Sequence, residues 1–190
     1  MAERRTLTIS ELRADPASRQ VMGIAAPYGV LSSDLGGFRE QIQPGAFTRS
    51  LKENPNMRAL YNHDSSLVLG TTKAGTLSLW DDPKGLAFKI DLPATSYAQD
   101  LIVLMSRGDV GQMSFGFFTR SDDWSRDSGE NRIRTLLDVD LREISIVGDP
   151  AYPDGTEAAL RSLERFSKDH QTRQAVERQR RLFVFASRRA

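Results

Sequence analysis

Short runs of alternating apolar and polar residues, separated by turn residues, fill most of the chain between residues 6 and 148. Period-2 alternation is typical of strands, and the Gly, Pro, Asp and Asn between the runs are typical of turns. Closely spaced strands with few helices favour a mainly β protein of the α+β class, an antiparallel sheet or barrel with peripheral helices. We expect strands near residues 7–9, 21–26, 57–62, 67–69, 77–79, 86–92 and 111–120, and within 132–147.

Two segments have the periodicity and end signals of helices. A short helix is expected after the Pro-Gly-Ala sequence at 44–46, and a longer one over 97–107. In the longer helix Ser96 and Gln99 fit a capping box, and Gly108 provides a C-terminal stop.

Charge divides the chain into a body and a tail. The chain has 190 residues and a net charge of +1, but residues 161–190 carry nine basic and three acidic side chains, a net +6 that leaves −5 for residues 1–160. The length fits one domain with an appended tail. We predict a folded domain over 1–155, with a polar loop at 121–131, and a basic tail over 156–190 that is helical or partly disordered.

What the sequence lacks excludes several kinds of site. Without cysteine there is no disulfide, cysteine nucleophile or thiolate metal site. The longest apolar run, 101–105, is far shorter than the ~20 residues of a membrane-spanning helix, and no export signal is expected. Phosphate-binding glycine motifs are absent, and the segment 111–116 does not fit the GxSxG turn of an α/β-hydrolase. We expect no membrane association, no cofactor and no metal.

Polar residues interrupt the apolar pattern of two predicted strands. Alternation over 57–63 places His63 at the end of an apolar face, where a neutral imidazole can act as a general base if another group holds its second nitrogen. Ser114 lies on the face opposite the core residues of its strand, and Gly116 leaves room there for a close approach of backbone or substrate. Each residue taken alone is better explained by a structural role.

Glu143 is expected to be at least half buried, because both faces of its strand are partly apolar. It shares one face with Leu141 and Val147, and a buried carboxylate needs a partner. That partner is either an arginine, Arg142 or Arg134, or the His63 ring. A serine, a histidine and a carboxylate together could supply the three roles of an acyl-transfer triad, although alternation does not bring them together.

Motifs between residues 21 and 153 occur in the order and with the spacing of a known protease family. In them the chain resembles the HK97-type prohead proteases of tailed phages, which are similar to herpesvirus assemblins, serine proteases built on a β-barrel with surrounding helices. The motifs are GIAAPY at 23–28, EQIQPGAF at 40–47, LYNHD at 60–64, VLG at 68–70, DPKGL at 82–86, RGDVGQMSFGF at 107–117, LREISIV at 141–147 and PAYP at 150–153.

The resemblance implies that His63 is the general base and Ser114 the nucleophile. Assemblins use a second histidine as the third member, but the other histidine here, His170, lies outside the matched region. We therefore expect a carboxylate. Glu143 is preferred to Asp140, because it shares the apolar face of its strand while Asp140 falls on the opposite face.

The resemblance also implies an endopeptidase that cleaves scaffold, or the scaffolding segment of the major capsid protein, and itself during prohead maturation. Backbone N–H groups of the loop 148–152, those of Gly148 and Ala151, would hold the oxyanion. We expect the protein in the host bacterial cytoplasm and inside the assembling prohead, where the basic tail would deliver it. Self-association is left open.

Three alternatives remain at this stage. The first is a non-catalytic capsid-assembly or scaffolding protein with the same fold. The second is a nucleic-acid-binding protein that uses the tail, although the body has no basic stripe with interleaved aromatics, so no nucleic acid is expected as a partner. The third is a metal hydrolase with His63 and Asp64 as ligands, which lacks an HExxH motif.

Overall fold

The computed structural model describes residues 2–8, 13–15 and 19–148. Two helices and ten strands are found in this part of the chain. They are β1 (Glu3–Thr8), β2 (Arg13–Asp15), β3 (Gln20–Pro27), β4 (Arg39–Ile42), α1 (Thr48–Glu53), β5 (Arg58–Tyr61), β6 (Asp64–Thr71), β7 (Leu77–Asp82), β8 (Gly85–Asp91), α2 (Ser96–Arg107), β9 (Gln112–Arg126) and β10 (Arg132–Val147).

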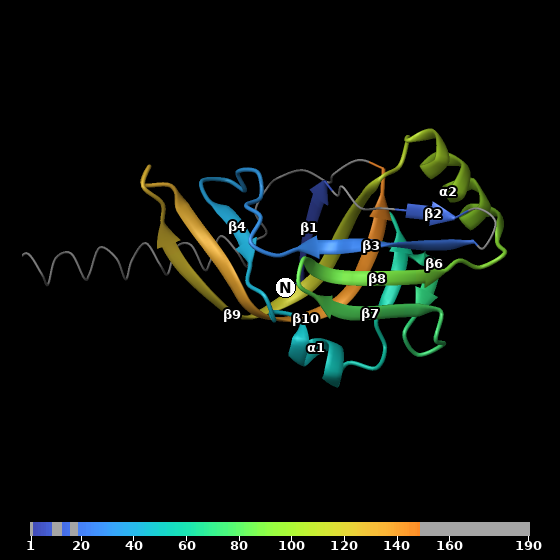
Figure 1. Cartoon of the computed structure of the whole chain (residues 1–190), viewed down its shortest axis with the longest axis horizontal. Coiled ribbons are helices and arrows are strands. Elements are labelled where there is room, and N and C mark those ends of the chain that lie inside the picture. Colours follow the sequence, from blue (N-terminus) through green and yellow to red (C-terminus); the bar gives the residue numbers. More distant parts are fainter. Residues whose placement is uncertain (1, 9–12, 16–18, 149–190) are drawn as a thin grey trace, which may run out of the picture. The chain divides into compact units, whose positions relative to one another are not determined.

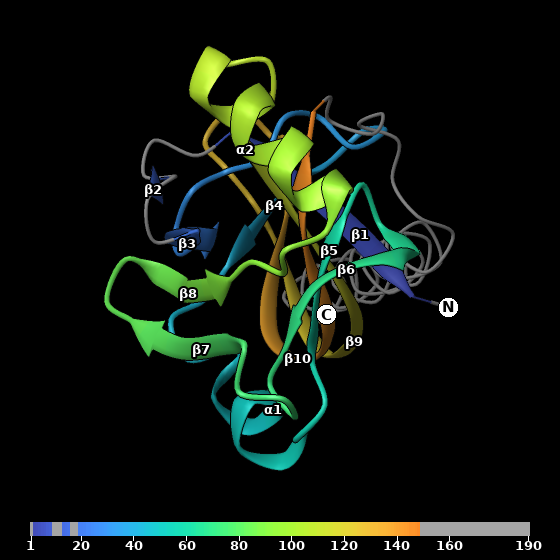
Figure 2. The same ribbon diagram turned by 90° about the vertical axis from the view of Figure 1, so that its right-hand side faces the viewer.

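The strands form two sheets that cross at a steep angle (Figure 1). The larger sheet has the order β1-β9-β10-β5-β6, with β4 also paired to β10. The smaller sheet has the order β2-β3-β8-β7. The helices lie at opposite ends of the sheets, α2 at the top and α1 at the bottom of Figure 2.

The predicted antiparallel barrel is only partly confirmed. The long strand β10 pairs antiparallel with β9, but its first half pairs parallel with β4 and its second half parallel with β5. Alternation along a strand predicts which face is buried but not the direction of its neighbour. Within the described residues the paired strands form two sheets, and no strand pair joins one sheet to the other.

The polar segment 121–131 is only partly the predicted loop, because residues 121–126 extend β9, and 127–131 form the turn before β10. Trp124 packs against Phe38 with ring centroids 5.1 Å apart. Arg134 donates a 2.6 Å hydrogen bond from Nε to Asp122. These contacts hold a polar strand in place, and polarity along the sequence does not reveal them.

The core lies between the two sheets. Alternate residues of β9, namely Met113, Phe115 and Phe117, are fully buried, as the alternation predicted. Phe115 stacks on Phe117 with centroids 5.0 Å apart and meets Phe47 edge-on at 5.8 Å. Burial of each such side chain stabilises the fold by roughly 1.5–3 kcal/mol. The smaller sheet contributes Val21, Leu86, Phe88 and Ile90 to the same cluster.

Both predicted helices are present. The short one, α1, follows the buried Phe47. In α2, Ala98 and Leu101 are buried, and the helix ends at Gly108, whose φ of 84° is the left-handed conformation of a glycine stop. The capping-box prediction is wrong, because the N-cap is Thr95 and no side-chain hydrogen bond caps the helix.

Four charged side chains are buried together where β1, β4 and β10 meet. Arg134 donates to Glu3 at 2.7 Å and to Glu40 at 2.9 Å. Arg5 donates to the same two carboxylates, at 2.7 Å each. Two positive and two negative charges balance, and each is hydrogen-bonded, as charges removed from water require. We call Glu3, Arg5, Glu40 and Arg134 the ionic cluster; it fixes the edge strand β1 to the larger sheet.

The segments predicted as a Pro-rich loop (149–154) and a basic tail (156–190) lie outside the described residues. Among the residues that are described, no helix is both long enough and apolar enough to cross a membrane.

Glu3 makes the stability of the fold depend on pH. Burial alone would raise the pKa of Glu3, but hydrogen bonds and charge attraction from Arg134 and Arg5 outweigh it and lower the pKa from 4.5 to about 2. The unfolded chain therefore binds this proton more readily than the folded one. The contribution of Glu3 to the free energy of unfolding is complete above about pH 4.5 and is lost as the pH falls towards 2.

Glu3→Gln should reduce the free energy of unfolding at pH 7 by about 3–5 kcal/mol, because it leaves a buried arginine without its full partner. Urea unfolding at several pH values would measure this, and the variant should lose part of the wild-type slope between pH 4.5 and 2. Glu130→Gln is the control, since Glu130 pairs with Arg126 at an exposed position. Equal effects of the two changes would contradict the stabilising role of the ionic cluster.

Candidate active site

His63 lies in a tight turn rather than at the end of a strand, which corrects the prediction from alternation. Tyr61 pairs with Asp64 across β5 and β6, so Asn62 and His63 form a two-residue loop, with φ values of 51° and 60°. Positive φ at both positions is the type I′ hairpin turn, which usually has glycine at the second. The left-handed conformation costs a non-glycine residue roughly 1–2 kcal/mol. A histidine held there is a signal of function.

The pairing of β9 with β10 places four residues in a block on one face of the larger sheet. Ser114 lies opposite Ser145, and Gly116 lies opposite Glu143. Residues directly opposite each other share a face. This face is the reverse of the one that buries Phe115 in the core.

A β-bulge at Arg142 puts Glu143 on this face. Leu141 pairs with Phe117 and Glu143 with Gly116, so Arg142 is an extra residue in β10. An extra residue reverses the alternation that follows it. The prediction that Leu141 and Glu143 share a face is therefore wrong: Leu141 faces the core and Glu143 faces away from it.

His63 connects Glu143 and Ser114, which occupy opposite corners of the four-residue block. Its Nδ1 lies 2.6 Å from Glu143 Oε1, and its Nε2 lies 2.7 Å from Ser114 Oγ. Because an ionised carboxylate only accepts hydrogen bonds, Nδ1–H donates to Glu143 and leaves Nε2 to accept from the Ser114 hydroxyl. Ser114 is fully buried, and the His63 and Glu143 side chains are 7% and 14% exposed. The arrangement is that of a nucleophile, a base and an orienting carboxylate.

Comparison with known families agrees with this geometry. The sequence model of the family described as "Caudovirus prohead serine protease" matches residues 6–169. The chain belongs to this family. Its members are proteases of capsid maturation in tailed phages. No curated protein sequence matches the chain.

A solved structure with a similar fold is the capsid assembly protease gp21 of bacteriophage T4. The TM-score is 0.50 at 10% sequence identity, and the match covers 77% of this chain and 97% of the T4 chain. At this identity the similarity is one of fold.

Gly116 makes room for the carboxylate of Glu143. A Cβ atom at Gly116 would lie 2.9 Å from Glu143 Cγ and 3.1 Å from Oε1, closer than unbonded atoms pack. The sequence had suggested that Gly116 leaves space for backbone or substrate. In the structure the Glu143 side chain occupies that space, and its carboxylate contacts His63.

The arginines considered as partners of Glu143 lie elsewhere. Arg134 belongs to the buried ionic cluster, and the Arg142 guanidinium lies 5.8 Å from the centre of the Phe118 ring. Instead Arg4 approaches Glu143 Oε1, with Nε at 3.7 Å. No sequence pattern points to Arg4, because the pairing of β1 with β9 cannot be read from local alternation. The Arg4 side chain is 59% exposed, so the pair stabilises the fold only weakly.

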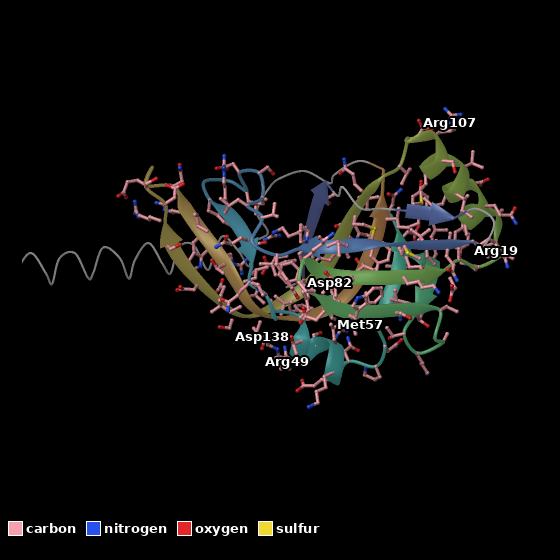
Figure 3. All side chains as sticks on the ribbon, in the orientation of Figure 1. Arg19, Arg49, Met57, Asp82, Arg107 and Asp138 are labelled. Carbon is pink, nitrogen blue, oxygen red and sulfur yellow. The ribbon has the colours of Figure 1, made fainter. Side chains whose placement is uncertain are left out.

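Asp140, the other carboxylate considered, belongs to a separate ionic group. It accepts hydrogen bonds from Arg49 on α1 at 2.6 Å and from Arg120 at 2.5 Å. Burial raises the pKa of Asp140, but the two arginines outweigh it, and the net shift is downward. Arg49 also binds Asp138, near the middle of β10; Figure 3 labels both residues.

Of the two candidate oxyanion donors, Gly148 is already engaged. Its N–H donates to Asn62 Oδ1 at 3.3 Å, so it is not free to bind a substrate oxygen in this arrangement. Ala151 lies outside the described residues.

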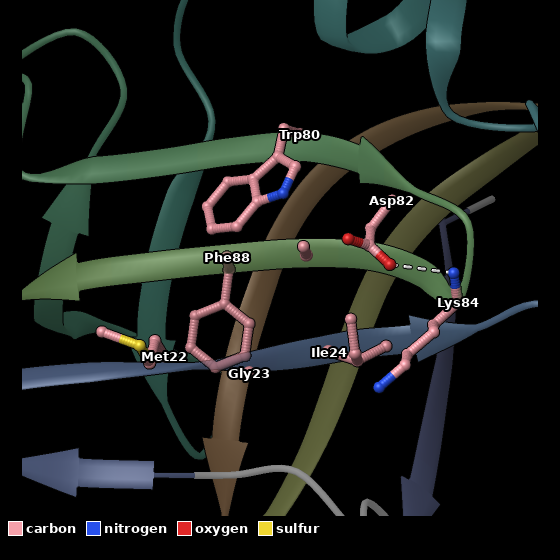
Figure 4. A pocket seen from close by; sticks show the side chains of 8 residues that line it. Met22, Gly23, Ile24, Trp80, Asp82, Lys84 and Phe88 are labelled. Atoms are coloured by element: carbon pink, nitrogen blue, oxygen red, sulfur yellow. Dashed lines mark hydrogen bonds between the residues drawn. The ribbon is translucent and has the colours of Figure 1, made fainter.

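The described residues contain a pocket but no cluster of metal ligands. No group of three or more His, Asp or Glu side chains there could hold a metal ion. A pocket of about 300 Å³ opens on the smaller sheet, between Met22, Trp80 and Phe88 (Figure 4). Its lining comes from β3, β7, β8 and the β7–β8 turn, and includes no residue of the Ser114–His63–Glu143 group.

Gly116→Ala should lower kcat/KM for peptide-bond hydrolysis by about 100-fold, because it displaces the Glu143 carboxylate from His63 and small misplacements of catalytic groups are costly. Gly111→Ala is the matched control: a Cβ there meets nothing within 4 Å. A peptide cleavage assay on both purified variants would measure the effect. Full activity in Gly116→Ala would contradict the need for this space.

Proposed function

We propose that this protein is a serine endopeptidase that cleaves scaffold, or the scaffolding segment of the major capsid protein, and itself during phage prohead maturation. The observation that carries the proposal is the continuous hydrogen-bonded series from Glu143 through His63 to Ser114. Family membership supports the reaction class and the setting.

In the first half of the reaction, His63 Nε2 takes the proton of Ser114 as Oγ attacks the peptide carbonyl carbon. Glu143 accepts from Nδ1–H and so keeps the ring in the tautomer whose Nε2 is free to accept. It also stabilises the imidazolium that forms. The imidazolium then returns the proton to the leaving amine, and the C–N bond breaks to give an acyl-enzyme on Ser114.

In the second half, water replaces the amine. His63 takes a proton from the water, whose oxygen attacks the acyl carbon, and the proton returns to Ser114 Oγ as the ester bond breaks. All three groups therefore end in their starting state.

Burial of the three groups has two consequences. Charge interactions within the group are screened less than at the surface, which favours the imidazolium–carboxylate pair. A substrate peptide reaches Ser114 Oγ only when the segments that cover it move, because Ser114 has no exposed surface in this structure. Such burial of Ser114 would keep the protease inactive before assembly.

Ser114→Ala and His63→Ala should each abolish processing of the capsid or scaffold protein, with a loss of at least about a thousandfold. The double variant should be no worse than either, because the two residues act as a unit. Mass spectrometry of the co-expressed substrate, and of the protease chain itself, measures both activities. A processed substrate in the presence of folded Ser114→Ala would support the alternative, a scaffolding protein cut by another enzyme.

Glu143→Gln should reduce the cleavage rate by about a hundred- to ten-thousandfold, because an amide cannot hold the same tautomer of His63 or balance the imidazolium. Asp140→Asn is the matched control, a carboxylate of the same strand that binds Arg49 and Arg120 instead. Its cleavage rate should stay within a few-fold of wild type. The reverse pattern would identify Asp140 as the orienting carboxylate.

A further inference from the structure

Ser145 is a neighbour of both Ser114 and Glu143 on the face of the sheet that carries the proposed catalytic group. It lies directly opposite Ser114 across β9 and β10, and two positions after Glu143 on β10. Ser114 and Glu143 occupy one diagonal of the four-residue block, and the small residues Ser145 and Gly116 occupy the other. The imidazole of His63, bonded at both ends of the first diagonal, therefore crosses the middle of the block, between Ser145 and Gly116.

The hydroxyl of Ser145 is buried without a partner. Ser145 has no exposed surface, and its Oγ has no hydrogen bond in the structure. Two other buried polar atoms in the described part of the chain share this property. One belongs to Thr95, at the start of α2, and the other to Gln112, a partly exposed residue. Among these three described residues, only Ser145 combines complete burial with a place beside the proposed nucleophile.

A buried hydroxyl without a partner is a cost to folding that alanine would remove. The Ser145 hydroxyl is therefore expected to form a hydrogen bond at another stage of the reaction. Both nitrogens of His63 are already engaged, one with Glu143 and one with Ser114. An acceptor directly opposite Ser145 is Ser114 Oγ, which donates its one hydrogen to His63 and has lone pairs to spare. Thr6 faces Ser114 from β1, but it is partly exposed and water can satisfy it.

We propose that Ser145 is a positioning residue that donates a hydrogen bond to Ser114 Oγ as His63 removes the Ser114 proton. This rests on the proposed function. Side chains directly opposite on paired strands have Cβ atoms about 4.5–5.5 Å apart, so rotation about χ1 brings the two oxygens to hydrogen-bonding distance. Ser145 keeps its own proton throughout. Its donor stabilises the charge that Ser114 Oγ gains in the transition state and orients the lone pair that attacks.

The test compares wild type, Ser145→Ala and Ser114→Ala in two assays. The first is the rate at which a fluorophosphonate probe labels Ser114, with the labelled residue located by mass spectrometry. The second is kcat and KM for a peptide substrate. Ser145→Ala should lower the labelling rate and kcat by about 10- to 100-fold and leave KM unchanged, because the lost hydrogen bond acts in the transition state. Its stability to urea should be equal to wild type or higher.

Ser50→Ala is the matched control. Ser50 is also a buried serine, but its Oγ accepts a 2.8 Å hydrogen bond from the Leu141 N–H. Its removal should lower the stability and leave kcat and the labelling rate unchanged. The two serines are thus expected to show opposite patterns.

Equal labelling rates in wild type and Ser145→Ala would overturn the role of Ser145 and leave the proposed function intact. An equal loss of kcat in Ser145→Ala and Ser50→Ala would also overturn it, since the effect would then be one of packing. Wild type that is not labelled at Ser114 would overturn the proposed function, and the role of Ser145 with it.

Discussion

The register between β9 and β10 is the constraint on which the candidate site depends. The two strands share one long hairpin, and the extra residue at Arg142 shifts their pairing between Leu141 and Glu143. Without that bulge Glu143 would face Phe115 and the apolar core. With it, Glu143 lies opposite Gly116 on the far face, two positions from Ser145 and one diagonal from Ser114. One inserted residue thus converts a core position into the position of the proposed orienting carboxylate.

Strand β9 packs in the core with one face and carries the proposed catalytic serine on the other. Phe115 and Phe117 hold one face of β9 in the apolar cluster, and Ser114 and Gly116 alternate with them on the other. Because the core side is closely packed, the backbone that carries the proposed nucleophile, Ser114, has little freedom to shift. The ionic cluster adds to this from the edge, since it ties β1, the strand paired with β9, to β4 and β10 through charges that only the folded arrangement satisfies.

The sequence predicted what depends on local pattern, and the structure adds what depends on neighbours. The core face of β9, the β7–β8 hairpin and the end of α2 at Gly108 follow from periodicity and turn chemistry. The parallel pairing of β10 and its bulge do not, because they are properties of strand pairs. The preference for Glu143 over Asp140 depends on an assignment of strand faces that the bulge invalidates. The two carboxylates differ instead in their positions along β10, which place Glu143 beside His63 and Asp140 beside Arg49. The Asn-His turn was readable in principle, since a histidine occupies the usual place of glycine in an Asn-Gly hairpin.

Several energetically unfavourable features of this fold lie close to Ser114. His63 has a left-handed backbone, the His63 and Glu143 side chains are nearly shielded from water, and Ser145 has a buried hydroxyl without a partner. Each is unfavourable for folding, and none is needed to close the core, which lies on the other face of the sheet. A large two-sheet core can offset such costs, but it gives no reason for them to lie within one block of four residues and the turn above it. Their convergence on Ser114 supports a site built for chemistry independently of any comparison with other proteins.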